Sequence, residues 1–417
     1  MDPQAAPNLP PGHHLGTPAY RRITVCLFLA GLVTFASLYG VQPLLPTLVA
    51  EFGISPGQST LAVSAATFGI GASLLVAGPL SEARGRRPLM LWSLYGASAT
   101  GIACGLAGSF EWLLVLRAVQ GVVLAGLPAV AMAYLSEELV AEAQARAAGL
   151  YIGGTAIGGM SGRLLAGGLA DRFGWRAGLV LIGVGSAVVA VVVAAVLPGS
   201  RRFVPAPASL GTLAATTRSI LADRVLVSLF AVAAAGMGGF VAVFNAVGFR
   251  LTQPPYALSV GAAGLVYLAY LPGSLSSTLA GRAVARFGQR AVAPWGAVAL
   301  AIGALLTLAE PLPLLGIGIA TLTVGLFALH GVASGWVAAR AVRGSGAPGQ
   351  ASSMYLFGYY AGASVFGALG GGLWSRYGWT AVVALCVVLS LVALALVAAL
   401  RRVPPLAPPS VAVSPSA

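Results

Sequence analysis

Charged residues are scarce in this sequence of 417 residues. There is no lysine, and ten acidic residues stand against 23 arginines, so only 8% of the chain is charged. Soluble globular proteins are about 25% charged. With 58% hydrophobic residues and a mean hydropathy of +0.91, the chain has too little polar surface to cover a water-soluble globule.

Motifs of enzymes and of ATP-driven proteins are also missing. Without lysine the chain cannot form the phosphate-binding GxxxxGK(S/T) loop, so it encodes no ATP drive. It has no HExxH, no paired carboxylates, and no GxSxG with His and Asp partners. Cys26, Cys104 and Cys386 lie in separate apolar segments without ligand-like spacing. We therefore expect a protein that is not an enzyme and has neither a cofactor nor a metal site.

Apolar residues come in blocks of about 20, the length at which a helix crosses the hydrocarbon core of a bilayer. The alternating segments typical of membrane β-barrels are absent. The sequence therefore predicts an all-α membrane protein with twelve transmembrane helices. The predicted spans are 23–46, 60–80, 89–107, 112–135, 148–170, 177–197, 225–249, 257–280, 291–309, 313–338, 350–373 and 380–400.

The arginines predict how these spans are oriented. If the N-terminus is cytoplasmic, 17 arginines lie on the cytoplasmic side and only Arg172, Arg176, Arg250 and Arg376 lie in outside loops. Cytoplasmic loops of membrane proteins carry such an excess of basic residues. The formal net charge of +13 therefore indicates orientation, and we expect no nucleic-acid partner. Both termini and the long central loop are predicted to be cytoplasmic.

The two halves of the chain resemble each other. At a shift of 204 residues, 147–175 aligns with 351–379 without a gap, and 11 of 29 positions are identical. At a shift of 203 the matching pairs are Gly78 with Gly281, Gly85 with Gly288, and Arg87 with Arg290. A duplicated unit of six spans gives two copies in the same orientation, which is a parallel repeat.

This duplication predicts two six-helix bundles joined by a longer and more polar segment. The predicted parts are a cytoplasmic N-terminal tail 1–22, an N-terminal bundle 23–197, a cytoplasmic linker 198–224, a C-terminal bundle 225–400 and a disordered, Pro-rich cytoplasmic tail 401–417.

Several motifs narrow the assignment. GPLSEARGRRP at 78–88, between the second and third spans, and RAVQG at 117–121 resemble signature motifs of the major facilitator superfamily of transporters. LYGVQPLLP at 38–46, YLSEE at 134–138 and QASSMYLFGYYAG at 350–362 resemble the YnfM type of bacterial inner-membrane efflux transporters. The resemblance implies the twelve-helix major facilitator fold in a bacterial inner membrane. It also implies a monomer, with the lipid bilayer, a small solute and protons as partners.

The charged loop at 78–88 is predicted to act as a gate. Glu82 precedes Arg86 by four residues, a spacing at which an acid and a base pair along a helix. The resemblance implies that this pair latches the halves at the cytoplasmic side, with a second acid from the end of the fourth span. In the second copy Ala285 and Gln289 replace Glu82 and Arg86, so the predicted latch is one-sided. The predicted gating residues are Gly78, Glu82, Gly85, Arg86, Arg87, Glu137 and Glu138. An ordinary cytoplasmic charge anchor is the alternative.

Polar residues within the spans are candidates for the pathway of the solute or of protons, because charges inside a bilayer usually face a cavity or a partner. They are Tyr39, Gln42, Arg117, Gln120, Arg163, Asn245, Tyr267, Tyr270, His330, Tyr355 and Tyr359. For Arg117 the alternative is to snorkel outward beside Glu111. For Arg163 it is a pair with Asp171 or bonds to nearby helix ends. Each tyrosine singly is equally well a packing residue.

His330 is the candidate proton site. It carries the only intramembrane side chain whose unperturbed pKa lies near neutrality, and no Asp or Glu falls in the middle of a span. A neutral histidine that is hydrogen-bonded to a facing helix is the alternative.

Glycines recur every four residues in two spans. They are Gly154, Gly158 and Gly162 in the fifth span, and Gly358 and Gly362 in the eleventh. Such ridges let helices approach closely. The resemblance implies that the fifth helix meets the eighth and the eleventh meets the second, so these glycines are predicted to line a moving interface. Simple tight packing is the alternative.

The sequence as a whole favours a secondary active transporter that works by alternating access. The predicted reaction is proton-coupled export, by antiport, of a neutral polar, anionic or drug-like compound. Embedded arginines without embedded acids argue against a lipophilic cation. The alternatives are a sensor or scaffold on the same fold, and a proton-coupled importer.

Overall fold

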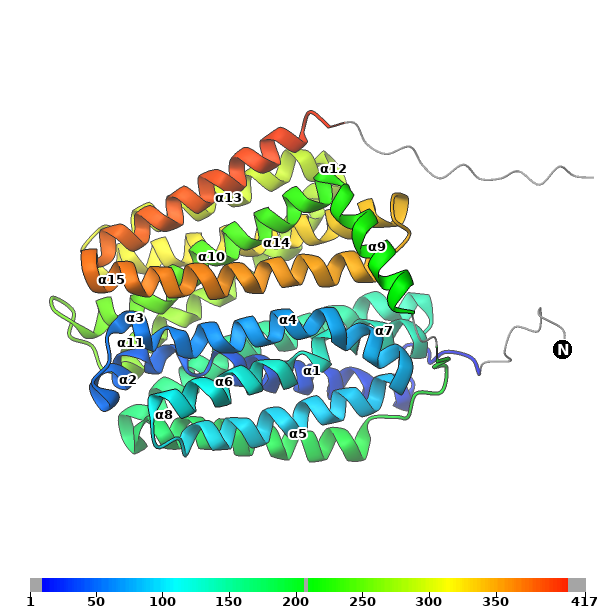
Figure 1. Ribbon diagram of the computed structural model, residues 1–417, viewed down its shortest axis with the longest axis horizontal. Helices are drawn as coiled ribbons and strands as arrows, with labels where there is room; N and C mark the ends of the chain where they lie inside the picture. The colour runs from blue at the N-terminus through cyan, green and yellow to red at the C-terminus, as the bar shows by residue number, and fades with distance from the viewer. Residues whose placement is uncertain (1–9, 206–208, 404–417) are drawn as a thin grey trace, which may run out of the picture.

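The computed structural model describes residues 10–205 and 209–403, and nearly all of this part of the chain is helical (Figure 1). Parts of the two predicted tails, 1–9 and 404–417, lie outside the described residues. The first half comprises α1 (Pro18–Tyr39), η1 (Gln42–Leu44), α2 (Leu45–Phe52), α3 (Pro56–Ser59), α4 (Leu61–Arg84), α5 (Arg86–Gly105), α6 (Phe110–Leu124), α7 (Gly126–Glu138) and α8 (Ala141–Val196). After α9 (Leu210–Ala222), the second half comprises α10 (Arg224–Thr252), α11 (Val260–Gly264), η2 (Leu265–Ala269), α12 (Tyr270–Phe287), α13 (Gln289–Leu306), α14 (Leu312–Arg343) and α15 (Pro348–Leu400).

Eight helical segments of the described chain are long and apolar enough to cross a membrane. α8 has 56 residues, which is about 84 Å at 1.5 Å per residue and far exceeds the ~30 Å hydrocarbon core. It holds two spans, because Gly174 interrupts the helix with a φ of 81°. Gly378 divides α15 in the same way, with a φ of 71°. With α5 and α12, which are not among the eight, the helical segments that the described residues form at the predicted positions number twelve.

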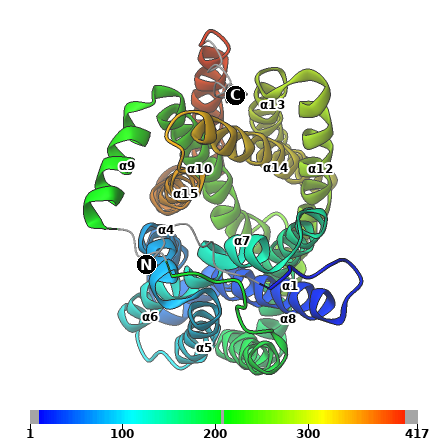
Figure 2. The ribbon, with the colours of Figure 1, turned by 90° about the vertical axis from the view of Figure 1, so that its right-hand side faces the viewer.

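The two halves lie side by side with their helices running in the same general direction (Figures 1 and 2). α9 and the start of α1 lie at one end of the bundle, on the right in Figure 1. We call it the linker end. The opposite end carries α2, α3 and α11, and we call it the far end.

Hydrogen bonds between the halves lie toward the far end. Ser64 of α4 and Ser364 of α15 each donate a hydroxyl hydrogen bond to the carbonyl oxygen of the other, at 2.8 and 2.9 Å. The Gly57 N–H donates to the Ser375 hydroxyl at 2.9 Å. At the linker end, no hydrogen bond or ion pair joins the halves within 10–205 and 209–403. There, a Cβ on Gly78 would find no atom within 4 Å.

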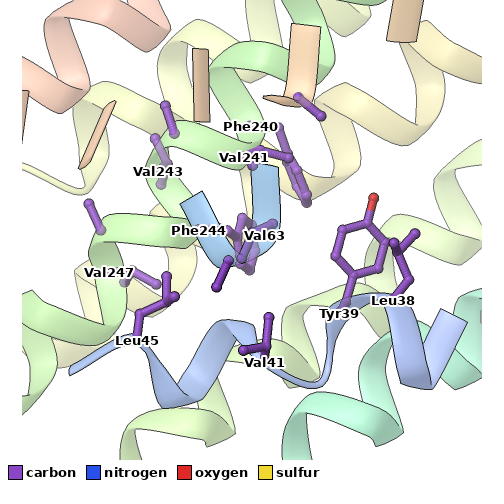
Figure 3. Packing of buried hydrophobic residues seen from close by; sticks show 14 of the residues in the cluster. Leu38, Tyr39, Val41, Leu45, Val63, Phe240, Val241, Val243, Phe244 and Val247 are labelled. Atoms are coloured by element: carbon purple, nitrogen blue, oxygen red, sulfur yellow. The ribbon is translucent and has the colours of Figure 1, made fainter. Parts of the chain in front are cut away.

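A shared apolar cluster also closes the far end. Val41 and Leu45 of the first half pack in one cluster with Phe244 and Val247 of α10 (Figure 3). All four side chains are fully buried. The structure is therefore shut at the far end and lacks the corresponding bonds at the linker end.

The structure corrects the predicted position of the glycine ridge in the fifth span. Gly154, Gly158 and Gly162 face α1 of their own half, and not the second half. A Cβ on Gly158 would lie 2.0 Å from the Leu32 carbonyl oxygen, and a Cβ on Gly154 or Gly162 would lie 2.4 Å from other backbone atoms of α1. Only glycine allows two helix backbones to come this close. The ridge therefore fixes helices within one bundle, which was the alternative reading of the pattern.

The glycines of the eleventh span also face a helix of their own half, and not the moving interface that the resemblance predicts. A Cβ on Gly358 or Gly362 would lie 2.9 or 2.1 Å from carbonyl oxygens of α10, in the same half.

Other small residues lie between the halves. A Cβ on Gly371 would lie 2.4 Å from the Thr60 side chain, and one on Gly71 would lie 2.9 Å from the Cβ of Tyr360.

The internal repeat is visible in the turn between the second and third spans of each half. Gly85 and Gly288 both adopt positive φ, 98° and 81°. The arginine two residues later then binds the carbonyl end of the last helix of its half. Arg87 donates to the Ala194 and Leu197 carbonyl oxygens at 2.6 and 3.1 Å, and Arg290 donates to that of Val403. A cation at a helix C-terminus is favourable, so Arg87 anchors one bundle.

Candidate functional site

Arg163 of α8 lies fully buried where the two halves meet. Its Nε donates to Gln42 Oε1 at 2.6 Å, and its Nη1 donates to the Gly159 carbonyl oxygen at 2.6 Å. Its Nη2 has no hydrogen-bond partner in the described chain. It forms no ion pair with Asp171, the alternative partner. One side of a buried guanidinium is therefore left without an acceptor.

Three tyrosine rings surround this guanidinium. The Arg163 Cζ lies 4.2 Å from the ring centroid of Tyr39, 4.8 Å from that of Tyr270 and 5.1 Å from that of Tyr267. These distances permit cation–π attraction. Tyr39 belongs to the same half as Arg163, whereas Tyr267 and Tyr270 belong to the other half. The aromatic surroundings are therefore divided between the two halves.

Gln42 links Arg163 to the second half. Its Nε2 donates to Asn245 Oδ1 at 2.7 Å, and Asn245 Nδ2 donates to the Gly367 carbonyl oxygen at 3.3 Å. The structure thus brings together six of the predicted pathway residues. We call them the Arg163 cluster: Tyr39, Gln42, Arg163, Asn245, Tyr267 and Tyr270.

Arg117 is also buried, but its partners lie within the first half. Its Nε donates to the Ala62 carbonyl oxygen at 2.9 Å, and Nη1 and Nη2 donate to carbonyl oxygens at the end of α1. Nη1 also donates to Gln120 Oε1. The alternative of snorkelling beside Glu111 is wrong, because Arg117 is only 1% exposed. Arg117 ties α6 to α1 and α4.

His330 lies in a separate aromatic cluster of the second half. Its Nδ1 is 3.0 Å from the Tyr355 hydroxyl, and its ring centroid is 4.6 Å from that of Tyr359. The side chain is partly buried, and it forms no ion pair in the part of the chain that the structure describes. Tyr355 and Tyr359 thus share a face of α15 that packs on His330.

The charged loop forms a different ion pair from the one that the spacing predicts. Gly85 ends α4, and Arg86 begins α5, so Glu82 and Arg86 do not lie on one continuous helix. Arg86 instead pairs with Glu137 at the end of α7, with Nη2 2.8 Å from Oε1. It also donates to the Ser81 hydroxyl. Glu82 is half-buried and forms no ion pair with a described residue.

Glu138 has a partner other than the predicted one. It is 1% exposed, and its Oε1 accepts hydrogen bonds from the backbone N–H groups of Arg201 and Arg202, at 2.7 and 3.0 Å. It therefore anchors the first residues of the linker to α7. In this conformation, Glu138 and Arg87 both hold the first half together, and neither contacts the second half.

The structure contains a bridge between the halves at the far end that the sequence analysis did not predict. Asp171 Oδ2 accepts from the Ser259 hydroxyl at 2.6 Å and from the Gly261 N–H at 2.9 Å, across the two halves. The repeat contained a signal for it. At a shift of 204, Asp171 aligns with Ser375 and Gly57 aligns with Gly261, and the Ser375–Gly57 bond is the second copy of this bridge.

We expect Asp171→Asn to weaken closure of the far end, because an amide accepts more weakly than a carboxylate. A cysteine at Ser364, which is buried between the halves, reports the change. Its reaction with a water-soluble maleimide should become faster by about three- to ten-fold, as for the loss of one hydrogen bond. Glu51→Gln is the matched control, since Glu51 pairs with Arg176 of its own half. Equal rates in both variants would contradict the bridge.

A family model and two relatives of similar length all relate this chain to the same family of transporters. The family model of the Major Facilitator Superfamily matches residues 27–273. The chain is 42% identical to the uncharacterized MFS-type transporter YybF of Bacillus subtilis over 387 residues, covering 93% of this chain and 95% of that one. It is 43% identical to the inner membrane transport protein YnfM of Escherichia coli, covering 93% and 92%.

Solved structures show the same fold at low identity. A bacterial homologue of the human lysosomal transporter Spinster, in an inward-facing and unoccupied conformation, has a TM-score of 0.75 at 18% identity and covers 92% of this chain and 97% of that one. A D-xylose–proton symporter has a TM-score of 0.70 at 17% identity, covering 90% and 97%.

Proposed function

The chain belongs to the Major Facilitator Superfamily, and from this we propose that it is a secondary active transporter that carries a small solute by alternating access. The observation that carries the proposal is the unequal contact between two similar six-helix halves. Hydrogen bonds and a bridging carboxylate join them at the far end, and the described chain has no such bond at the linker end. Rocking of one half against the other exchanges which end is closed.

Orientation follows from the arginines. The linker end carries the 17 arginines on one side of the spans, and the excess of basic residues favours the cytoplasm for that end. Both termini and the linker are then cytoplasmic, in a bacterial inner membrane. In the conformation described here, hydrogen bonds then join the halves on the outer side, and none joins them on the cytoplasmic side within the described residues.

The cytoplasmic gate is assigned to the charged loop and its neighbours. Glu82 lies on α4, which packs against α15 of the other half, and it is free of ion pairs with described residues. Arg86 and Glu137 hold the start of α5 beside it. In the alternate conformation, Glu82, Arg86 and Glu137 face the second half. Glu82 then has a buried polar partner in the second half.

The solute is assigned as neutral polar, anionic or drug-like, and export coupled to proton entry is the proposed direction. The central cluster contains an arginine and no carboxylate, which disfavours a cationic solute. His330 is the proposed proton site, because it is the titratable group in the spans that lies among polar rings and outside any ion pair of the described chain.

Flux through proteoliposomes tests the proposal. The purified protein, under a pH gradient of either sign, is given a panel of labelled neutral, anionic and drug-like solutes. We expect at least one solute to cross faster than in protein-free liposomes, and the sign of the effective gradient separates export from import. Failure of every solute under both gradients would remove transport as the function.

His330→Gln tests proton coupling within the same assay. Glutamine keeps a side chain that can bond to Tyr355, but it cannot titrate. We expect gradient-driven flux to fall by about ten-fold or more, while exchange of the solute at equal pH persists. Tyr355→Phe is the control for loss of the contact alone. Unchanged gradient-driven flux in His330→Gln would assign the proton to another group.

A further inference from the structure

Two buried arginines in the first half differ in how their donors are used. In Arg117, Nε, Nη1 and Nη2 all donate to oxygen atoms of the same half. In Arg163, Nε and Nη1 donate, and Nη2 has no partner among the described residues. Both side chains are at most 1% exposed. The difference therefore reflects the partners that the protein supplies, and not access to water.

The ring of Tyr267, which carries a second donor without a described partner, lies beside Arg163. The Tyr267 ring centroid is 5.1 Å from the Arg163 Cζ, and the buried Tyr267 hydroxyl has no hydrogen-bond partner in the described chain. Buried polar groups in folded proteins are normally hydrogen-bonded. Arg163 Nη2 and the Tyr267 hydroxyl are buried donors without a partner among the described residues, and no carboxylate pairs with the guanidinium there, so the chemistry of the cluster suits an anion with two acceptor oxygens.

We propose that Arg163 Nη2 and the Tyr267 hydroxyl bind the carboxylate of the transported solute. The proposal rests on the transport function proposed above and names its solute as an organic monocarboxylate. A carboxylate offers two oxygens to two donors and cancels one positive charge. The Tyr39 and Tyr270 rings, which flank the guanidinium at 4.2 and 4.8 Å, supply an apolar wall for the carbon skeleton.

The position of the site links binding to closure of the far end. Arg163 and Tyr39 move with the first half, and Tyr267 and Tyr270 move with the second. Opening the far end withdraws Tyr267 and Tyr270 and exposes the guanidinium to that side. Closing it buries a charge, which is unfavourable unless an opposite charge is buried with it. A bound carboxylate therefore favours closure of the far end around Arg163, which is the step that moves the solute from one side to the other.

The repeat shows that the guanidinium is specific to the first half. Arg163 aligns with Gly367 at a shift of 204, and Gly367 offers only its carbonyl oxygen, which accepts from Asn245. The second copy therefore has no guanidinium at this position, and one carboxylate per transporter is expected.

Thermal stability of the purified protein in lipid nanodiscs tests the site. The probes are acetate, hexanoate, benzoate and 2-naphthoate, each paired with its uncharged primary amide. We expect at least one carboxylate to raise the melting temperature of the wild type by about 2 °C or more, and its amide to leave it unchanged. Arg163→Gln should abolish this shift. Arg172→Gln, which removes an exposed arginine outside the site on the same helix, should retain it.

The difference between each carboxylate and its amide separates this role from a structural one. Arg163→Gln loses the bond to Gly159 and the contacts with three rings, so its melting temperature without ligand should fall in either case. Only a binding role makes the variant respond equally to each carboxylate and its amide. Tyr267→Phe should keep the fold and weaken the carboxylate shift.

The proposal is overturned if no carboxylate exceeds its amide, or if Arg163→Gln still responds to the carboxylate more than to its amide. These outcomes are distinct from failure of the transport function. A wild type that binds a carboxylate without moving any solute would keep this site and contradict transport. Flux of neutral solutes only, without carboxylate binding, would keep transport and contradict this site.

Discussion

Gly158→Val is expected to abolish accumulation of the folded protein. A Cβ at this position would lie 2.0 Å from the Leu32 carbonyl oxygen and 2.6 Å from the Leu32 Cα and carbonyl carbon. These are backbone atoms of α1, which cannot move aside as a flexible side chain can. The two helices would have to separate along their whole contact. We expect a loss of about 3 kcal/mol or more, the upper range for overpacking.

Gly153, on the same helix, provides the control. A Cβ there would find no atom within 4 Å, so Gly153→Val should leave the yield nearly unchanged, and Gly153→Ala should gain from its better helix propensity. The measurement is the monodisperse fraction of a fluorescent fusion on size-exclusion chromatography, with its melting temperature. Equal losses at both positions would show that the clash with α1 does not govern folding.

This glycine shows what a sequence can predict about such a fold. Its spacing of four from Gly154 and Gly162 predicts a close helix contact, which the structure contains. The partner helix does not follow from the spacing, because a ridge of small residues packs equally well on any helix. The rotation of α8 about its own axis decides that the ridge faces α1, and that rotation depends on all neighbours at once.

The spans and the repeat were predictable for a simpler reason. Each span is a local property, since about 20 apolar residues must form a helix in a bilayer. The repeat is a direct comparison of residues, and the structure places Gly174 and Gly378 at matching interruptions, as the shift of 204 requires. Neither inference depends on how helices dock.

The partners in ion pairs, in contrast, could not be predicted from spacing along the chain. The spacing of Glu82 and Arg86 suggests a pair only if one helix runs through both, and the positive φ of Gly85 ends that helix between them. Arg86 then pairs with Glu137, 51 residues later, one of the two acids that the family resemblance suggests and that the spacing does not. In the same way, the sequence alone makes Arg117 and Arg163 equally good candidates for the transport pathway. Their different numbers of acceptors appear only when α1, α4 and α12 are in place.

The second large effect is expected from a cross-link between the halves. Ser64 and Ser364 exchange hydroxyl-to-carbonyl hydrogen bonds at 2.8 and 2.9 Å, so cysteines at both positions lie within reach of a disulfide. The Ser64→Cys, Ser364→Cys variant should transport normally when reduced. When oxidised it should lose at least about twenty-fold in flux of the solute identified in proteoliposomes, because the far end can no longer open. Added reductant should restore the rate.

A cross-link inside one half separates locking from nonspecific damage. The Ser37 and Ser186 hydroxyls lie 3.1 Å apart in the first half, and a Ser37→Cys, Ser186→Cys pair joins α1 to α8 without bridging the halves. If each half moves as a rigid body, this second disulfide should leave flux unchanged. Flux that continues in the first variant, with its disulfide confirmed by mass spectrometry, would contradict alternating access. Flux lost in both variants would instead mean that each bundle must deform during transport, and the motion would lie within the halves rather than between them.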